Sequence, residues 1–275
     1  MPVHRLWPPA HAASAPRPGD PDAAEPDGAE PDGAELNGAE LNDAELLAHY
    51  AYPADLSAPH VRVNFVSSLD GAASVDGLSG GLGSAADRTV FGVLRRLADV
   101  VLAGAGTVRA ENYRGARATT IGRTTPPPIA VVTGSADLDP AARLFTDTAV
   151  APIVLTVADA AARRVDALRA AGADVVVLPD LAPATLLAEL GRRGLHRVLC
   201  EGGARLHGAL VAADAVDELC LTLAPLLTAG PAGRIAAGPA ADPPPRMTLR
   251  GALAASDALL LHYERDRLLR SGEGA

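Results

Sequence analysis

Short apolar segments alternate with amphipathic helical patterns along the middle of the chain. Helices are predicted over residues 86–98, 159–171, 183–193 and 204–213, where apolar residues recur at helical spacing. Strands are predicted where the runs are short and β-branched, over residues 61–67, 99–103, 129–133, 153–156, 174–178 and 197–200. Such alternation is typical of parallel strands joined by right-handed crossovers.

The C-terminal part departs from this rhythm. Residues 216–223, 246–254 and 258–263 are strand-like, and no helical pattern separates them. Consecutive strands without intervening helices favour antiparallel pairing at one edge of the sheet. The predicted fold class is therefore α/β, a mixed and mostly parallel sheet flanked by helices, with antiparallel C-terminal strands. We expect it to form one domain over residues 46–275.

The first 45 residues have a different composition, rich in Pro, Ala, Gly and acidic side chains. A pentapeptide of the type Glu-Pro-Asp-Gly-Ala recurs between Glu25 and Ala44. A period of five matches neither a strand nor a helix, and so little apolar surface cannot offset the entropy of ordering. We predict a disordered acidic extension over residues 1–45; a partner-docking tail is the alternative.

Composition excludes several classes of function. The chain of 275 residues has a net charge of −9 and contains no Lys, so Schiff-base lysine chemistry and a lysine P-loop are excluded. No basic cluster lies on a predicted helix, which makes nucleic acid and anionic membranes poor partners. Without a signal-peptide pattern or a bilayer-spanning apolar run, a cytoplasmic location is expected. Cys200 and Cys220 lie in predicted strands as core thiols, and the scattered histidines favour no metal site.

Two glycine turns follow buried strands, at Gly104–Thr107 and at Gly202–Gly203, and each leads into a helical segment. Free N–H groups and the positive end of a helix dipole meet at such turns and suit a phosphate. Thr133 and Ser135 end a third strand and could hydrogen-bond a ribose or its phosphate. Although Arg109 replaces the third glycine of the Rossmann fingerprint, the three strand ends together indicate a dinucleotide site.

Four motifs in this order resemble the reductase domain of riboflavin biosynthesis, the C-terminal half of the bifunctional pyrimidine deaminase–reductase. They are Ser68-Leu69-Asp70-Gly71, the segment from Leu94 to Val108, Glu201-Gly202-Gly203, and Val216-Asp217-Glu218-Leu219. The zinc-deaminase signature is absent from the sequence. The resemblance implies a dihydrofolate reductase-like fold and a stand-alone reductase of the actinobacterial type.

By this resemblance, NADPH is the hydride donor, and 5-amino-6-(5-phosphoribosylamino)uracil is the substrate of a homodimeric enzyme. It places the cofactor along Gly104, Thr107, Glu111, Thr133 and Ser135, with the diphosphate at Gly202, Gly203, Ala204, Arg205 and Leu206. It places the substrate near Ser79, Arg95 and Glu201, with Arg114 or Arg117 positioned to hold the phosphate bidentately. Glu201, an acid at the end of a buried strand, is the first candidate for a catalytic group.

The chain also differs from the family pattern. Ala72 and Ala73 follow Gly71, where family reductases usually place a Lys or Arg on the substrate side. Glu111-Asn112-Tyr113 replaces a usual Asp-Asn-Pro or Asp-Asp-Pro. The missing cation after Gly71 and the long acidic tail leave open a non-catalytic NADPH-binding paralogue.

Asp87 is the second candidate for a catalytic group. It lies in the first turn of the first predicted helix of the domain, beside a glycine-rich loop. It is either a helix cap or a carboxylate that binds an aminopyrimidine ring and assists protonation. The second role would also suit a pterin such as dihydrofolate, so a pterin reductase of the same fold is an alternative function.

Overall fold

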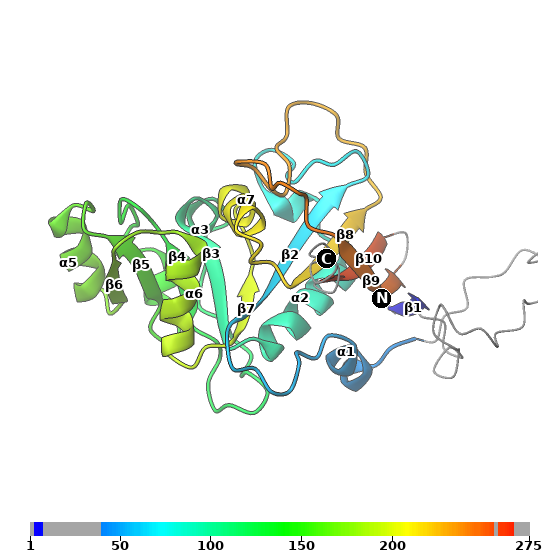
Figure 1. Cartoon of the computed structure of the whole chain (residues 1–275), viewed down its shortest axis with the longest axis horizontal. Helices are drawn as coiled ribbons and strands as arrows, with labels where there is room; N and C mark the ends of the chain where they lie inside the picture. Colours follow the sequence, from blue (N-terminus) through cyan, green and yellow to red (C-terminus); the bar gives the residue numbers. More distant parts are fainter. Residues whose placement is uncertain (1–2, 8–39, 256–257, 267–275) are drawn as a thin grey trace, which may run out of the picture.

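A computed structural model describes residues 3–7, 40–255 and 258–266. They form a ten-stranded sheet in the order β1-β9-β10-β8-β2-β7-β3-β4-β5-β6 (Figure 1). All neighbours from β8 to β6 pair in parallel, whereas β1, β9, β10 and β8 pair antiparallel. In sequence order the strands are His4–Trp7, His60–Ser68, Val100–Gly104, Ile129–Val132, Ile153–Val157, Asp174–Leu178, Arg197–Cys200, Glu218–Ala224, Met247–Ala255 and Ala258–Arg265.

Helices cover both faces of the parallel part of the sheet (Figure 1). The two faces follow from the alternation of β3, in which Val101 and Ala103 belong to one core and Val100 and Leu102 to the other. The first core includes apolar residues of α1 to α5, and the second includes those of α6 and α7. The helices are α1 Asp43–His49, α2 Ala85–Leu97, α3 Ala105–Ala110, α4 Arg143–Thr146, α5 Ala162–Ala170, α6 Pro183–Arg192 and α7 Ala204–Ala212, with a 3-10 turn, η2, at Ser79–Gly81.

The predicted fold class, a mixed and mostly parallel sheet with antiparallel C-terminal strands, is confirmed. The predicted disorder of residues 1–45 is wrong at the two ends of that range. Residues 4–7 lie within the range predicted to be disordered, yet they form β1, which pairs with β9 because an edge strand offers unpaired backbone groups. Helix α1 also begins inside that range, at Asp43, with a capping box between Asn42 and Glu45. Most of the pentapeptide repeat lies outside the described residues.

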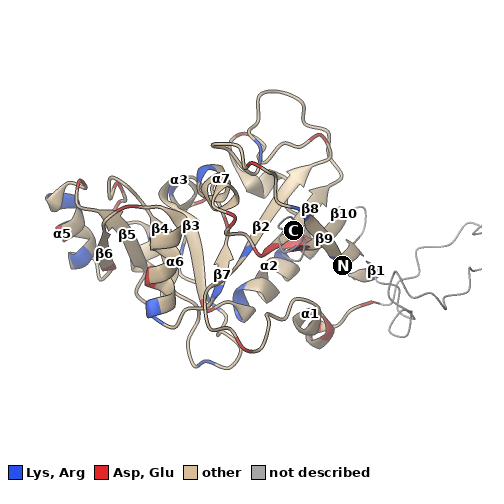
Figure 2. Cartoon of the chain, viewed as in Figure 1, with Lys and Arg blue, Asp and Glu red and all other residues tan. Residues whose placement is uncertain are grey.

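Surface charges of both signs are interspersed over α5 and α6 (Figure 2), where Arg169 pairs with Asp166 and Arg192 pairs with Glu189. Neither helix therefore presents a surface of one sign. Among the described residues, no helix has the length and apolar character needed to cross a membrane. The same part of the chain holds no cluster of His, Cys, Asp and Glu suited to a metal ion.

Both cysteines are free and buried, as expected for core thiols. Burial raises the pKa of Cys200 and of Cys220 to about 12. Neither thiol is therefore ionised near neutral pH, which makes both poor nucleophiles.

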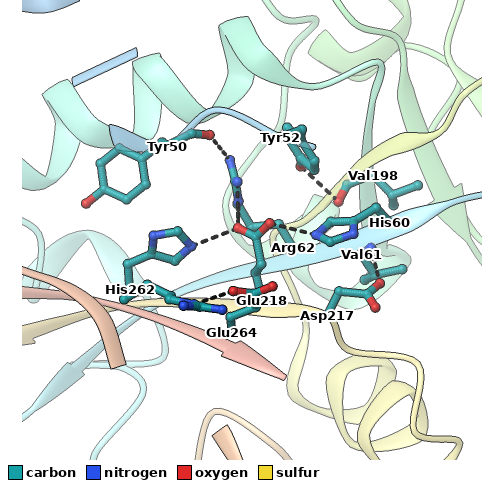
Figure 3. A network of polar contacts seen from close by, with 11 residues as sticks. Tyr50, Tyr52, His60, Val61, Arg62, Val198, Asp217, Glu218, His262 and Glu264 are labelled. Atoms are coloured by element: carbon teal, nitrogen blue, oxygen red, sulfur yellow. Dashed lines mark hydrogen bonds and ion pairs between the residues drawn. The ribbon is translucent and has the colours of Figure 1, made fainter. Parts of the chain in front are cut away.

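A buried ion pair joins the parallel and antiparallel halves of the sheet (Figure 3). Arg62 of β2 and Glu218 of β8 are register partners, and Arg62 Nε donates to Glu218 Oε2 at 2.7 Å. The fully buried Arg62 guanidinium also donates to the Tyr50 carbonyl and lies 4.0 Å from the centre of the Tyr52 ring. Two imidazoles complete the network, with Nε2 of His60 and of His262 at 2.6 and 2.8 Å from the carboxylate oxygens of Glu218.

The electrostatic consequence is that the buried Glu218 carboxylate is ionised near neutral pH. Burial alone would raise the pKa of Glu218, but the hydrogen bonds from His262 and His60 and the charge of Arg62 hold it well below its usual range. His49 packs edge-on against Tyr50 near this network, and its buried Nε2 has no hydrogen-bond partner among the described residues. Burial and the charges of His262, Arg5 and Arg62 lower the pKa of His49 to about 4.

We predict that Glu218→Gln destabilises the protein by about 3–5 kcal/mol, because it leaves the buried Arg62 charge uncompensated. Glu264→Gln is the matched control, since Glu264 pairs with Arg250 on the exposed surface. The control is expected to cost less than about 1 kcal/mol. Urea unfolding of both variants measures the difference, and equal losses would contradict the central role of the Arg62–Glu218 pair.

His49 predicts a pH dependence of stability. Its folded pKa of about 4 lies below the unfolded value of 6.5, so the unfolded chain binds a proton first as the pH falls. Its contribution is therefore full above pH 6.5 and decreases by about 3 kcal/mol as the pH falls to about 4. His49→Phe should remove this part of the acid sensitivity, as measured by urea unfolding at several pH values. A wild-type slope in the variant would assign the sensitivity to other groups.

Candidate active site

A cavity of about 420 Å³ opens at the carboxyl ends of β2, β3 and β7. Parallel strands place their carboxyl ends at one edge of a sheet, so loops from distant parts of the sequence meet there. Seven of the residues predicted for the site line the cavity. These are Ser79, Asp87, Thr107, Glu111, Glu201, Gly203 and Ala204. Gly106 from the first glycine turn lines it as well.

The two predicted glycine turns lie against each other and form one wall of the cavity. The Gly104 N–H donates to the Gly202 carbonyl at 2.7 Å, which joins the end of β3 to the end of β7. Gly202 has a φ of 110°, a conformation that favours glycine. A Cβ on Gly203 would lie 2.6 Å from Thr107 Oγ1, so any larger residue here would displace the Thr107 hydroxyl.

Helix α7 begins directly at this wall. Its N-cap, Gly203, has no side chain to bond the free N–H groups of the first turn. Ala204 lines the cavity, whereas the side chain of Arg205 is exposed and that of Leu206 packs against the second core. A ligand at this position would therefore meet backbone N–H groups, which is the arrangement that suits a phosphate.

Glu201 is buried at the end of β7 and is bound by two side chains from other elements. Arg95 of α2 donates to both carboxylate oxygens, at 2.7 and 2.6 Å, and the Tyr113 hydroxyl donates at 2.9 Å. Burial, and then the adjacent negative charge of Glu201, raise the pKa of Tyr113 well above its ordinary value. Arg95 thus holds Glu201 rather than projecting freely into the cavity.

Tyr113 was not among the residues predicted for the site. The sequence signal was its replacement of a proline in the family pattern, but the pattern gave no partner for its hydroxyl. A carboxylate has about four acceptor positions, and three are used here, so one position on Glu201 is left for a ligand donor.

Asp87 and Glu111 line the same cavity and have different surroundings. Ser84, not Asp87, caps helix α2, so the helix-cap interpretation of Asp87 is wrong. The Asp87 carboxylate instead accepts a hydrogen bond from Thr222 at 2.7 Å, and burial raises its pKa. Glu111 accepts from the backbone N–H of Ser79 at 2.8 Å and so connects α3 to η2 in the glycine-rich loop.

A second cavity of about 390 Å³ lies beside the first, and the two share the side chains of Phe91, Glu111 and Tyr113. Arg114, one of the two candidates for a phosphate ligand, lines this second cavity with Arg95 and Arg143. Arg117, the other candidate, is exposed and forms an ion pair with Asp147.

Thr133 and Ser135, which were predicted to bind the cofactor at the end of a third strand, line neither cavity. Thr133 is buried directly after β4, and its N–H donates to the Leu155 carbonyl at 3.0 Å. Ser135 is exposed, and its carbonyl accepts a hydrogen bond from Arg164 at 3.4 Å. Both follow β4 at the carboxyl edge of the sheet, next to β3, so they extend this edge away from the glycine wall.

The Ser-Leu-Asp-Gly motif holds a distant loop. Asp70 accepts hydrogen bonds from the N–H groups of Thr228 at 3.1 Å and Ala229 at 2.7 Å. The hydrogen bond from the Ser68 hydroxyl, followed by those from the Ala229 and Thr228 N–H groups, holds the pKa of Asp70 well below its usual range. The motif was recognised in the sequence, but this long-range contact between β2 and the loop after β8 was not predicted.

Comparisons with known proteins all point to the same family. The family model described as the RibD C-terminal domain matches residues 59–261. The riboflavin biosynthesis protein RibD of Mycobacterium tuberculosis is 31% identical over 175 residues, which cover 63% of this chain and 44% of that protein. RibD of Bacillus amyloliquefaciens is 31% identical over 176 residues, which cover 62% and 47%. The match thus spans less than half the length of these relatives.

Solved structures share the fold. A pyrimidine reductase-like protein from Corynebacterium diphtheriae aligns with a TM-score of 0.67 and 24% identity, covering 76% of this chain and 92% of that chain. Acinetobacter baumannii RibD aligns with a TM-score of 0.64 and 21% identity, covering 76% and 58%.

We predict that Gly203→Ala destabilises the protein by about 1–3 kcal/mol, because the added Cβ meets the Thr107 hydroxyl. Gly106→Ala is the matched control, since a Cβ there meets no atom within 4 Å and alanine is the better helix former. Adding Thr107→Ala to Gly203→Ala should restore most of the lost stability. Thermal unfolding measures all variants, and the same melting temperature for Gly203→Ala and Gly106→Ala would refute the close approach.

Proposed function

Because the chain belongs to the RibD C-terminal domain family, we propose that it is an NADPH-dependent reductase of 5-amino-6-(5-phosphoribosylamino)uracil in riboflavin biosynthesis. The observation that carries the proposal is the meeting of the glycine wall, the α7 N-terminus and the buried Glu201 around one cavity. Such a combination offers a phosphate position beside a polar group that orients a second ligand.

The residues present fit a dinucleotide. The proposed binding surface comprises Gly104, Thr107, Gly202, Gly203 and the first turn of α7, where a larger residue at position 203 would meet Thr107. Ala204, Arg205 and Leu206 would offer backbone N–H groups to the diphosphate, and Thr133, Ser135 and Glu111 would lie along the rest of the cofactor. When bound, NADPH supplies the hydride that reduces C1 of the ribosyl group.

The substrate side is proposed from the second part of the cavity. Arg95 and Tyr113 fix the Glu201 carboxylate, whose free acceptor position would orient a donor of the pyrimidine ring. Asp87, whose pKa is raised by burial, is the proposed proton donor near the reacting atoms. Ser79 would contact the substrate from the glycine-rich loop, and Arg114 would bind its phosphate from the neighbouring cavity, with Arg117 as the alternative.

Two other functions are supported by particular observations. Asp87 lines the cavity with a raised pKa, an arrangement that also suits a pterin substrate such as dihydrofolate. Ala72 and Ala73 leave the usual cation absent, which favours a non-catalytic NADPH-binding paralogue. For the reductase we propose a cytoplasmic location and a homodimeric state. Gel filtration with light scattering measures the molar mass and so tests the dimer.

The deciding experiment follows NADPH oxidation by the purified protein with the deaminated pyrimidine phosphate or with dihydrofolate. We expect turnover with the first substrate and growth rescue of a riboflavin auxotroph that lacks the reductase. Turnover with dihydrofolate alone would assign a pterin reductase. Tight NADPH binding without turnover of either compound would assign the non-catalytic paralogue.

Asp87→Asn provides the internal test of the proton donor. The variant should lower kcat about 10²-fold with little change in NADPH affinity, because the amide cannot supply a proton. Asp166→Asn on the exposed surface of α5 is the matched control and should leave kcat unchanged. An unchanged kcat in Asp87→Asn would remove this residue from the proposed mechanism.

A further inference from the structure

The segment of residues 225–246, between β8 and β9, crosses back over the carboxyl edge of the sheet. At its start, Asp70 binds the N–H groups of Thr228 and Ala229. Further along, the Ala73 N–H donates to the Gly233 carbonyl at 2.9 Å. The segment therefore lies against the turn that follows β2.

The same segment is also attached to α7 on the other side of the cavity. His207 Nδ1 lies 3.0 Å from the Ile235 carbonyl, and the Ala237 N–H donates to the Ala204 carbonyl at 2.9 Å. Gly208 permits this contact, because a Cβ there would lie 2.3 Å from the Ala237 carbonyl oxygen. Residues 233–235 are thus held between the end of β2 and the α7 N-terminus.

Arg234 lies at the centre of this bridge and lines the main cavity. The Arg234 side chain is exposed and forms no ion pair or hydrogen bond with the described residues. Arg95, by contrast, lines the neighbouring cavity and is bound to Glu201. Of the residues that line the main cavity, Arg234 is the one with a positive charge, and no acidic partner neutralises it.

The position of Arg234 also bears on Ala72 and Ala73, which stand where the family pattern usually has a cation. Residues 73 and 233 are joined by a backbone hydrogen bond, so Arg234 reaches the cavity beside the place where the expected cation is absent. We propose that Arg234 binds a phosphate group of the ligand in this cavity and replaces, from a different loop, the cation missing after Gly71. The guanidinium is suited to this role because it binds phosphate oxygens bidentately.

This proposal rests on the proposed function, because that function supplies the two candidate ligands that carry phosphate, the phosphoribosyl substrate and NADPH. Calorimetric titrations of the full chain with ribose 5-phosphate and with NADPH distinguish them. Arg234→Gln should weaken binding of one of these ligands about ten- to hundredfold, because a charge-assisted contact is lost. Arg234→Lys should recover part of the affinity, since it restores the charge without the planar fork.

Arg169→Gln on α5 is the matched control, because it removes the same charge from an exposed position outside the cavity. It should change neither affinity. If Arg234→Gln loses affinity for ribose 5-phosphate alone, Arg234 lies on the substrate side. If it loses affinity for NADPH alone, Arg234 lies at the cofactor. Unchanged affinities for both ligands in Arg234→Gln, or equal losses in Arg169→Gln, would overturn the proposal.

The two proposals fail in different ways. If Arg234→Gln weakens phosphate binding while the wild-type protein does not oxidise NADPH with the pyrimidine, the phosphate site stands and the proposed reaction fails. If the wild-type protein is active and Arg234→Gln has unchanged affinities, the reaction stands and the role of Arg234 fails. A wild-type protein that binds neither ligand would overturn both.

Discussion

The buried ion pair between Arg62 and Glu218 is the interaction on which the arrangement of the sheet depends. It joins register partners on β2 and β8, the two strands where the parallel and antiparallel halves meet. A shift of one residue would move Arg62 to the other face and leave both charges buried without partners. The pair therefore specifies how the end of β2 lies relative to β8, and with it the turn at Asp70 that positions the loop over the cavity.

The polar groups of the site are arranged around internal partners. Glu201 is held by Arg95 and Tyr113, Asp87 by Thr222, and Glu111 by the Ser79 backbone. These bonds offset the cost of burying carboxylates before any ligand is present. The groups that remain for a ligand include one acceptor on Glu201, the backbone N–H groups of α7 and the charge of Arg234.

Differences from the family pattern have local structural counterparts. Tyr113 stands where the pattern has proline, and its hydroxyl donates the third hydrogen bond to Glu201, besides the two from Arg95. Ala73 stands where a cation is usual, and its N–H binds the loop that carries Arg234. In both cases the changed residue makes a polar contact with a segment that is distant in the sequence. The consequence of each change is therefore visible only in the folded structure.

The sequence by itself determined the fold class, because apolar runs with period-two or helical spacing bury their surface in few ways. It also located the glycine turns at Gly104 and Gly202, since strand, glycine and helix follow one another locally. It did not predict β1, whose four residues become a strand only by pairing with β9. The tertiary structure alone decided the partners of Glu201, Asp87 and Asp70, and the contact of Ala73 with Gly233, the neighbour of Arg234. Each of these contacts joins residues far apart in the chain, and local spacing carries no information about such distances.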